Sequence, residues 1–177
     1  MRNKLFLFVF LFAVLAITDS HAFERKKYNF NSEWRLQIGD FPEAKQSQFD
    51  DSRWKAVTLP HAFNEDEAFK VSIEQLTDTV VWYRKHFRIP ASGKKQKVFI
   101  EFEGVRQAGD FYLNGQLLGK HENGVMAVGF DLTPYIKEGD NVLAVRTDND
   151  WMYREKSTNS KFQWNDRNFN ANYGGLP

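Results

Sequence analysis

The sequence has 177 residues, with 24 Lys and Arg against 23 Asp and Glu, a formal net charge of +1 and no cysteine. Because the charges are so evenly balanced, the chain lacks the excess of basic residues with which proteins bind nucleic acids or anionic membrane surfaces. The absence of cysteine excludes disulfides, thiol nucleophiles and thiolate metal sites. The length suits one domain with a single hydrophobic core.

The first 22 residues have the order of a secretory signal peptide. A basic start precedes an apolar run over residues 5–17, and Ser20-His21-Ala22 is a small-x-small cleavage site. The run is shorter than the ~20 residues that a membrane-spanning helix needs. We therefore expect cleavage after Ala22, a mature chain of residues 23–177, a secreted or periplasmic location and no membrane span. A buried N-terminal helix is the alternative.

The first part of the mature chain predicts two strands around a loop. The segments 33–38 ("EWRLQI") and 54–60 ("WKAVTLP") resemble strands, and the loop over residues 41–53 has room for one helical turn. Residues 61–78 ("HAFNEDEAFKVSIEQLTD") are polar and irregular, which is typical of a long loop that carries function.

A two-residue alternation dominates from residue 80 onward and predicts antiparallel strands. The segment 80–89 puts Trp82 and Arg84 on one face and Val81, Tyr83, Lys85 and Phe87 on the other. Further short strands are expected within residues 109–132 and 141–149. Asn114-Gly115 and Asn123-Gly124 are type I′ hairpin signals, because both central residues of that turn need positive φ. This spacing predicts an all-β antiparallel sandwich or barrel.

One helical turn is expected at "LTPYIKEGDN", residues 132–141. Thr133 can cap it, Pro134 suits its first position and Gly139 suits the residue just past its end.

Two glutamates in the strand at residues 98–103 invite a catalytic interpretation. Glu101 and Glu103 project from one face about 6.5–7 Å apart, a separation found between the carboxylates of glycoside hydrolases. They also alternate with Ile100 and Phe102, so the simpler interpretation is the solvent face of an amphipathic strand.

Other polar residues have weaker signals. His61 follows Pro60 at the end of a strand and is expected either to contact a ligand or order the loop, or simply to cap that loop. The acidic segments 64–67 and 148–150 could hold a hard cation or could be solvated loops. Neither matches a Ca²⁺ loop, and the histidines lack zinc spacing, so we assign no metal.

Aromatic side chains crowd residues 151–173, interleaved with Asn and Asp. Trp164 and Asn165 illustrate the pattern, in which a ring stacks on a sugar and an amide holds its hydroxyl groups. An aromatic plug that packs this segment onto the sandwich is an equal alternative.

Several motifs together resemble glycoside hydrolase family 2. They are "FDDSRWKAVTLPHAFN", "VVWYRKHFRIP", "EFEGV", "YLNG", "FDLT", "NVLAVRTDN" and the final "NYGGLP", in the order and spacing of the family. The match is to its N-terminal jelly-roll, or sugar-binding, domain in β-galactosidase-like members. The resemblance implies a galactose-binding-domain-like jelly-roll β-sandwich.

The resemblance also implies a larger enzyme. Family members continue through an immunoglobulin-like sandwich into a (β/α)₈ barrel, whose two glutamates perform retaining hydrolysis. We therefore expect a chain truncated before those domains, with no catalytic residue and no cofactor of its own. Its expected partners are a carbohydrate substrate and the downstream barrel of the same polypeptide. A stand-alone carbohydrate-binding module and a purely structural scaffold are the alternatives.

The resemblance carries over only a few site residues. Asp148, Asn149 and Asp150 match a family loop that helps to shape the sugar subsite, and residues 77–79 match a second loop near it. Together with Trp164, Asn165 and His61 from the residue patterns, these are the expected substrate-binding positions.

Overall fold

The computed structural model describes residues 25–71, 76–89, 96–122, 126–150, 153 and 174–176. The chain divides into two units, Met1–Phe30 and Asn31–Pro177. The described residues of the first unit, 25–30, form no regular secondary structure. All elements below belong to the second unit.

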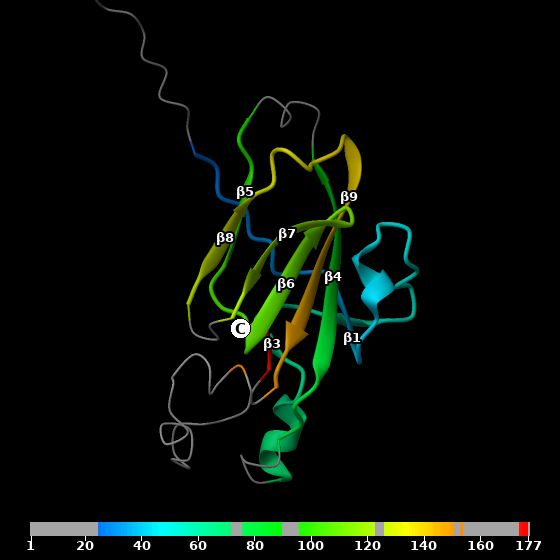
Figure 1. Cartoon of the computed structure of the whole chain (residues 1–177), viewed down its shortest axis with the longest axis vertical. Helices are drawn as coiled ribbons and strands as arrows, with labels where there is room; N and C mark the ends of the chain where they lie inside the picture. The colour runs from blue at the N-terminus through cyan, green and yellow to red at the C-terminus, as the bar shows by residue number, and fades with distance from the viewer. Residues whose placement is uncertain are drawn as a thin grey trace, which may run out of the picture. The chain divides into compact units, whose positions relative to one another are not determined.

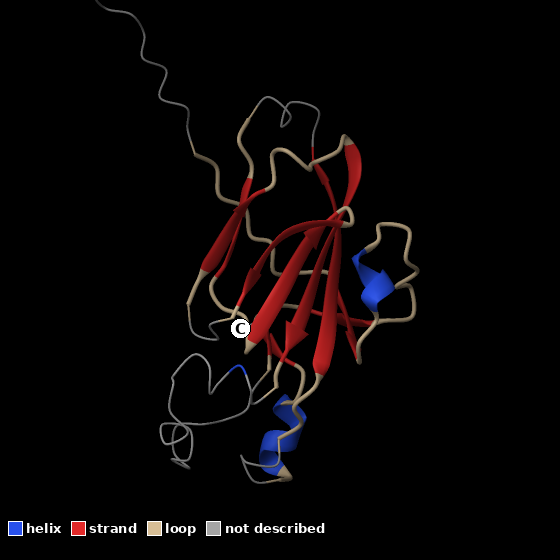
Figure 2. Cartoon of the chain, in the orientation of Figure 1, coloured by secondary structure: helices blue, strands red, loops and turns tan. Residues whose placement is uncertain are grey.

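The second unit is built almost entirely from short strands (Figure 2). In chain order the elements are β1 (Trp34–Ile38), the 3₁₀ helix η1 (Pro42–Lys45), β2 (Lys55–Val57), β3 (His61–Ala62), the 3₁₀ helix η2 (Glu65–Phe69), β4 (Val80–Ile89), β5 (Phe99–Phe102), β6 (Ala108–Leu113), β7 (Gln116–His121), β8 (Val128–Asp131), β9 (Gly139–Asp148) and β10 (Gly175–Leu176).

One large antiparallel sheet has the strand order β2-β1-β4-β9-β6-β7, and two small sheets pair β5 with β8 and β10 with β3 (Figure 1). Its central ladder joins β4 and β9 over ten residue pairs, from Val80 opposite Asp148 to Ile89 opposite Gly139. The end of β9 therefore lies beside the start of β4. The predicted all-β antiparallel fold is confirmed.

Aromatic rings join the large sheet to the β5–β8 pair. The ring of Phe111 on β6 lies 4.8 Å from that of Phe102 on β5 and 4.8 Å from that of Phe130 on β8. Trp34 on β1 meets Phe102 edge to face at 6.3 Å. Such pairs add ~0.5–1.5 kcal/mol each beyond their buried area, so they help to define the sandwich core.

The predicted alternation between a buried and an exposed face is confirmed in β5, whereas residues 81–85 of β4 are buried on both faces. In β4, Val81, Tyr83 and Lys85 are buried on one face and Trp82 and Arg84 on the other, while His86 beyond them has a side chain that is 48% exposed. In β5, Phe102 is buried and Phe99 is 65% exposed. Glu101 and Glu103 are exposed on the side of Phe99. These two glutamates form the solvent face of the strand, as the simpler interpretation expected.

The hairpin between β6 and β7 has the turn that its sequence predicts. Asn114 and Gly115 have φ of 53° and 87°, as a type I′ turn requires, and Leu113 pairs with Gln116 across it. Asn123-Gly124 lies outside the described residues. The single helical turn expected near Thr133 is present, because the N–H groups of Tyr135 and Ile136 both donate to the carbonyl of Leu132 at 3.0 Å. Thr133 does not cap it, because its hydroxyl accepts the N–H of Val98 at 2.9 Å.

A buried arginine holds a long loop on the outer face of the large sheet. The guanidinium of Arg84 on β4 donates from Nε to Oδ2 of Asp51 at 2.8 Å. It also donates to the carbonyls of Ala44, of Gln46 at 2.9 Å and of Phe49 at 3.3 Å. Three backbone carbonyls and one carboxylate therefore share this single side chain, which fixes the loop containing η1.

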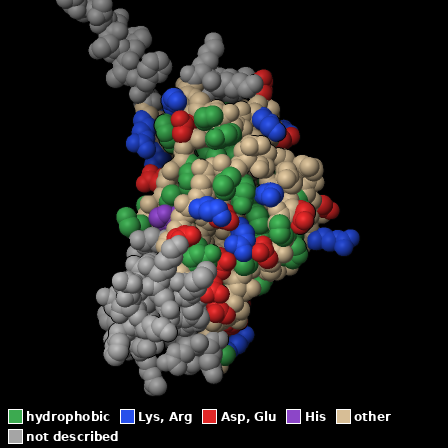
Figure 3. Space-filling model, in the orientation of Figure 1, with side chains coloured by type: hydrophobic (Ala, Val, Ile, Leu, Met, Phe, Trp, Pro, Cys, Tyr) green, Lys and Arg blue, Asp and Glu red, His purple; other side chains and the backbone are tan. Residues whose placement is uncertain are grey.

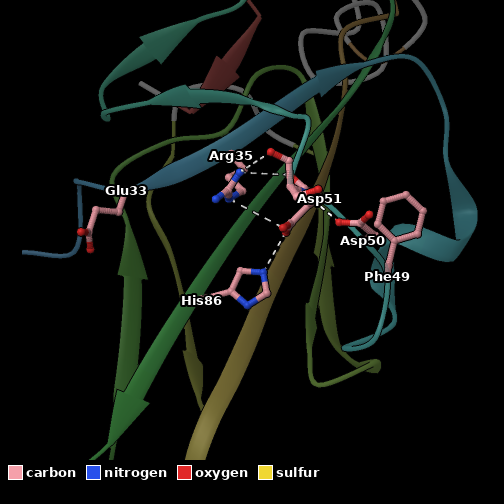
Figure 4. A pocket seen from close by; sticks show the side chains of 7 residues that line it. Glu33, Arg35, Phe49, Asp50, Asp51 and His86 are labelled. Carbon is pink, nitrogen blue, oxygen red and sulfur yellow. Dashed lines mark hydrogen bonds and ion pairs between the residues drawn. The ribbon is translucent and has the colours of Figure 1, made fainter.

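Asp51 is the acidic centre of this network (Figure 4). It accepts a second bond from Nε2 of His86 at 2.8 Å, while Arg35 lies 3.7 Å from its other oxygen. Burial alone would raise the pKa of this carboxyl, but the hydrogen bonds from His86 and Arg84 outweigh it and lower the pKa below its ordinary value. The folded state therefore favours the ionised carboxylate.

Replacing Arg84 is expected to destabilise the domain strongly. In Arg84→Met, Asp51 and three carbonyls lose a buried donor, which lowers the free energy of unfolding by about 3–5 kcal/mol. Urea denaturation followed by tryptophan fluorescence measures this change. The matched control is Arg88→Met on the same face of β4, where both partners of the Arg88–Asp140 pair are exposed and the loss stays within ~1 kcal/mol. Equal losses in the two variants would contradict the anchoring role of Arg84.

Asp51 is expected to make the free energy of unfolding depend on pH in the acid range. Because its pKa is lower in the folded than in the unfolded state, its contribution is complete above about pH 4 and is lost as the pH falls through the folded pKa. Asp51→Asn should be less stable at pH 7 yet lose less stability between pH 6 and pH 3. Urea midpoints across that range test this, with exposed Glu43→Gln keeping the wild-type slope. An unchanged slope in Asp51→Asn would refute it.

Candidate functional site

The turn after β9 is the candidate site, because it carries three of the expected residues. Asp148 ends β9, with its side chain 16% exposed. Its Oδ2 accepts from Nη1 of Arg146 at 3.2 Å, and its Oδ1 accepts the backbone N–H of Asp150 at 3.2 Å. Asp150 is exposed. The carboxylate of Asp148 therefore shapes the turn that presents Asp150.

Asn149 points to the opposite side and is fully buried. Its N–H donates to the carbonyl of Thr79 at 3.2 Å, and its side-chain Nδ2 lies 3.5 Å from the carbonyl of Thr77. The structure thus brings together the two loops that the resemblance identified, residues 77–79 and 148–150. In this domain Asn149 holds them side by side.

Asn64 ties two more segments to this point. Its Nδ2 donates to the carbonyl of Thr77 at 3.0 Å, and its Oδ1 accepts the N–H of Gly174 at 3.1 Å. A Cβ on Gly174 would collide with the ring of Phe63 and would lie 2.7 Å from Cγ of Asn149. A glycine is therefore needed for the segment before β10 to approach so closely.

The loop at residue 77 is also gripped from η2. Glu67 accepts the N–H of Thr77 at 2.7 Å and its hydroxyl at 2.5 Å. These hydrogen bonds to the ionised form lower the pKa of Glu67, whose side chain is partly exposed. We call these two bonds the Glu67–Thr77 clasp.

On the outer face, Arg146 connects Asp148 to the loop after β1. Its Nε and Nη2 donate to the two oxygens of Asp40 at 3.1 and 2.9 Å, and the indole of Trp82 donates to Asp40 at 3.2 Å. The guanidinium of Arg146 lowers the pKa of Asp40, and Asp40 in turn raises the pKa of Arg146. The turn after β9 is thus held from both faces of its strand.

Beside this ion pair lies a small hollow of about 180 Å³. Tyr112, Asp110 and Lys45 are among the residues that line it, and the ring of Tyr112 stacks on Trp82 at 5.9 Å. Its volume is below the ~300–1,000 Å³ usual for ligand pockets. Two of its charged lining residues, Asp40 and Arg146, are paired with each other, and Asp110 is paired with Lys120.

A larger hollow of about 420 Å³ lies over Asp51, between Arg35, Phe49 and His86 (Figure 4). Arg35 points across it and donates to the carbonyls of Asp51 at 3.2 Å and Ser52 at 3.0 Å. The polar groups of its floor are therefore already bonded within the loop that Arg84 anchors. This hollow belongs to the folding network and not to the turn after β9.

His61 is placed in the small β3–β10 sheet, paired with Leu176. Its Nδ1 lies 3.1 Å from the hydroxyl of Tyr83, which is buried in the core. Burial lowers the pKa of His61, with the positive charge of Lys55 as a smaller cause, and burial raises the pKa of Tyr83. His61 is half-buried, and its contact with Tyr83 joins the start of the irregular loop to the core, while its expected role at a ligand site stays a prediction.

Trp164 and Asn165 lie outside the described residues, so their expected role stays a prediction. Within the described ranges, no three His, Asp or Glu side chains gather as metal ligands, and no helix is long and apolar enough to cross a membrane. Lys and Arg are interspersed with Asp and Glu on the face drawn in Figure 3.

The sequence did not reveal the roles of Glu67, Asn64 and Arg146. Glu67 and Asn64 belong to the acidic segment considered as a cation loop, and nothing in that segment points to Thr77 ten or more residues away. Arg146 pairs with Asp40 across 106 residues of sequence. The available signal was the position of the two loops in the sequence, because residues 77–79 precede β4 and residues 148–150 lie at the end of β9.

Comparison with known proteins agrees with this architecture. The sequence profile "Glycosyl hydrolases family 2, sugar binding domain" matches residues 21–168. A β-glucuronidase of Formosa agariphila is 38% identical over 163 residues, which are 86% of this chain and 16% of that protein. A β-galactosidase of Thermoanaerobacter pseudethanolicus is 39% identical over 126 residues, 70% of this chain and 17% of that protein.

A solved structure of a β-glucuronidase from glycoside hydrolase family 2 superposes with a TM-score of 0.74 at 36% identity. The superposition covers 84% of this chain and 16% of that one. The chain thus spans about a sixth of the length of the relatives that it matches. It belongs to glycosyl hydrolase family 2, and what it carries is the N-terminal sugar-binding domain of that family.

Proposed function

We propose that this chain is the N-terminal part of a secreted retaining β-glycosidase, in which it supports a downstream catalytic barrel and forms one wall of the sugar subsite. The relatives named above are a β-glucuronidase and a β-galactosidase, which supports a β-linked galactoside or glucuronide as the substrate. The two catalytic glutamates of the retaining mechanism would come from the barrel.

The observation that carries this proposal is the geometry of the turn after β9. Asp150 is exposed at the end of the central strand of a rigid sheet, and Asp148 and Asn149 fix the turn from opposite faces. Because the backbone of this turn is fixed, the exposed carboxylate of Asp150 starts from a set position from which it can accept hydrogen bonds from sugar hydroxyls. We assign the direct sugar contact to Asp150 and the shaping of the turn to Asp148 and Asn149.

The other expected site residues are supported less directly. His61 would order the loop behind the subsite through Tyr83. Trp164 and Asn165 follow Asp150 along the chain, and we propose a stacking ring and a hydroxyl-binding amide for them on their residue types alone. A stand-alone carbohydrate-binding module would instead bind oligosaccharides as the isolated chain, which calorimetry can measure.

Export is expected to remove the first 22 residues. The basic start, apolar run and small-x-small site of the sequence support this. N-terminal sequencing of the exported protein should begin at Phe23. An exported protein that begins at Met1 would refute the signal peptide.

Removing the Asp150 carboxylate is expected to weaken catalysis by the enzyme encoded in the complete reading frame. In Asp150→Ala, kcat/KM for nitrophenyl β-galactoside or β-glucuronide should fall about tenfold, with an unchanged melting temperature, because an exposed side chain contributes little to folding. The matched control is Asp140→Ala at the far end of β9, ~25 Å along the strand, which should keep wild-type kinetics.

Two outcomes would contradict the proposal. Unchanged kinetics in Asp150→Ala would favour a scaffold that does not touch the sugar. A reading frame without a catalytic barrel would remove the glycosidase itself.

A further inference from the structure

The Glu67–Thr77 clasp is connected to the exposed Asp150 through Asn149, which contacts the loop of residues 77–79 and precedes Asp150 in the chain. Glu67 holds Thr77 through its N–H at 2.7 Å and its hydroxyl at 2.5 Å. The carbonyl of Thr77 faces Nδ2 of Asn149, and the carbonyl of Thr79 accepts the N–H of Asn149 at 3.2 Å. The chain of contacts therefore runs from η2, through the loop before β4, to the residue that precedes Asp150.

We propose that Glu67 is a positioning residue, which sets the direction of Asp150 by clasping Thr77. This inference rests on the proposed function, since it concerns how the sugar contact of Asp150 is aimed. Glu67 itself is partly exposed on a five-residue 3₁₀ helix and would touch no sugar in this assignment.

The geometry of the clasp favours aiming over simple stabilisation. Two bonds from one carboxylate to the N–H and hydroxyl of the same residue fix both the place and the rotation of that residue. An exposed hydrogen bond contributes little net stability, because water replaces it at almost equal free energy. Its main effect is therefore to select one orientation of residues 77–79, and through them of the turn after β9.

The lowered pKa of Glu67 agrees with this arrangement, because the two donors from Thr77 favour the ionised carboxylate. Asn64 contributes from the same loop by donating to the carbonyl of Thr77 at 3.0 Å. Asn64 is buried and also holds Gly174, so its removal would disturb the fold as a whole. Glu67 is the member of this set that can be changed without opening the core.

Three variants of the enzyme from the complete reading frame test the positioning role. Glu67→Met removes both acceptors at similar side-chain length and should lower kcat/KM about three- to tenfold with little change in melting temperature. Glu67→Gln can accept the N–H and donate to the hydroxyl oxygen, so it should restore most of the loss. The matched control is Glu65→Met on the same helix, which should keep wild-type kinetics.

A double-mutant cycle separates positioning from a general effect on the fold. If Glu67 acts through Asp150, the loss caused by Glu67→Met disappears when Asp150→Ala is already present. Faster amide exchange at Thr77 and Asn149 in Glu67→Met should accompany it. An equal loss in both backgrounds, or no loss in either, overturns the positioning role while Asp150→Ala remains impaired. If Asp150→Ala alone has no effect, the proposed function fails first and the positioning role with it.

Discussion

The buried guanidinium of Arg84 is the interaction on which one whole face of this domain depends. A loop that crosses the outer face of a sheet must satisfy its own backbone carbonyls without a neighbouring strand. Here one side chain serves the carbonyls of Ala44, Gln46 and Phe49 and neutralises Asp51. A bound loop in turn covers Trp82 and Ala144, so the large sheet has apolar contacts on both faces.

Local chemistry explains why much of the fold could be predicted from the sequence. Asn114-Gly115 specifies its turn through its own φ preferences, and the alternation in β5 records which face is buried. Thr133 shows where this reasoning fails, because its hydroxyl bonds to Val98, 35 residues away, instead of capping its own turn. A local signal cannot anticipate a better partner brought in by the tertiary fold.

The sequence allowed us to predict which loops form the candidate site, but not which side chains hold those loops together. The residues 148–150 and 77–79 were identified by resemblance, and the pairing of Val80 with Asp148 brings them together. The two loops are held by side chains that belong to no sequence motif. Glu67, Asn64 and Arg146 each form a hydrogen bond to a partner between 10 and 106 residues away. The domain thus uses ordinary polar residues, at long range, to leave one carboxylate exposed on a rigid base.

The ten-pair ladder between β4 and β9 also governs how the chain must fold. Its partners are separated by 50 to 68 residues, so no part of the ladder can form until a long loop has closed. Non-local pairing of this kind makes folding slow relative to helical proteins of similar size. A newly made chain therefore spends time with its central strands unpaired, and it needs protection from aggregation during that interval.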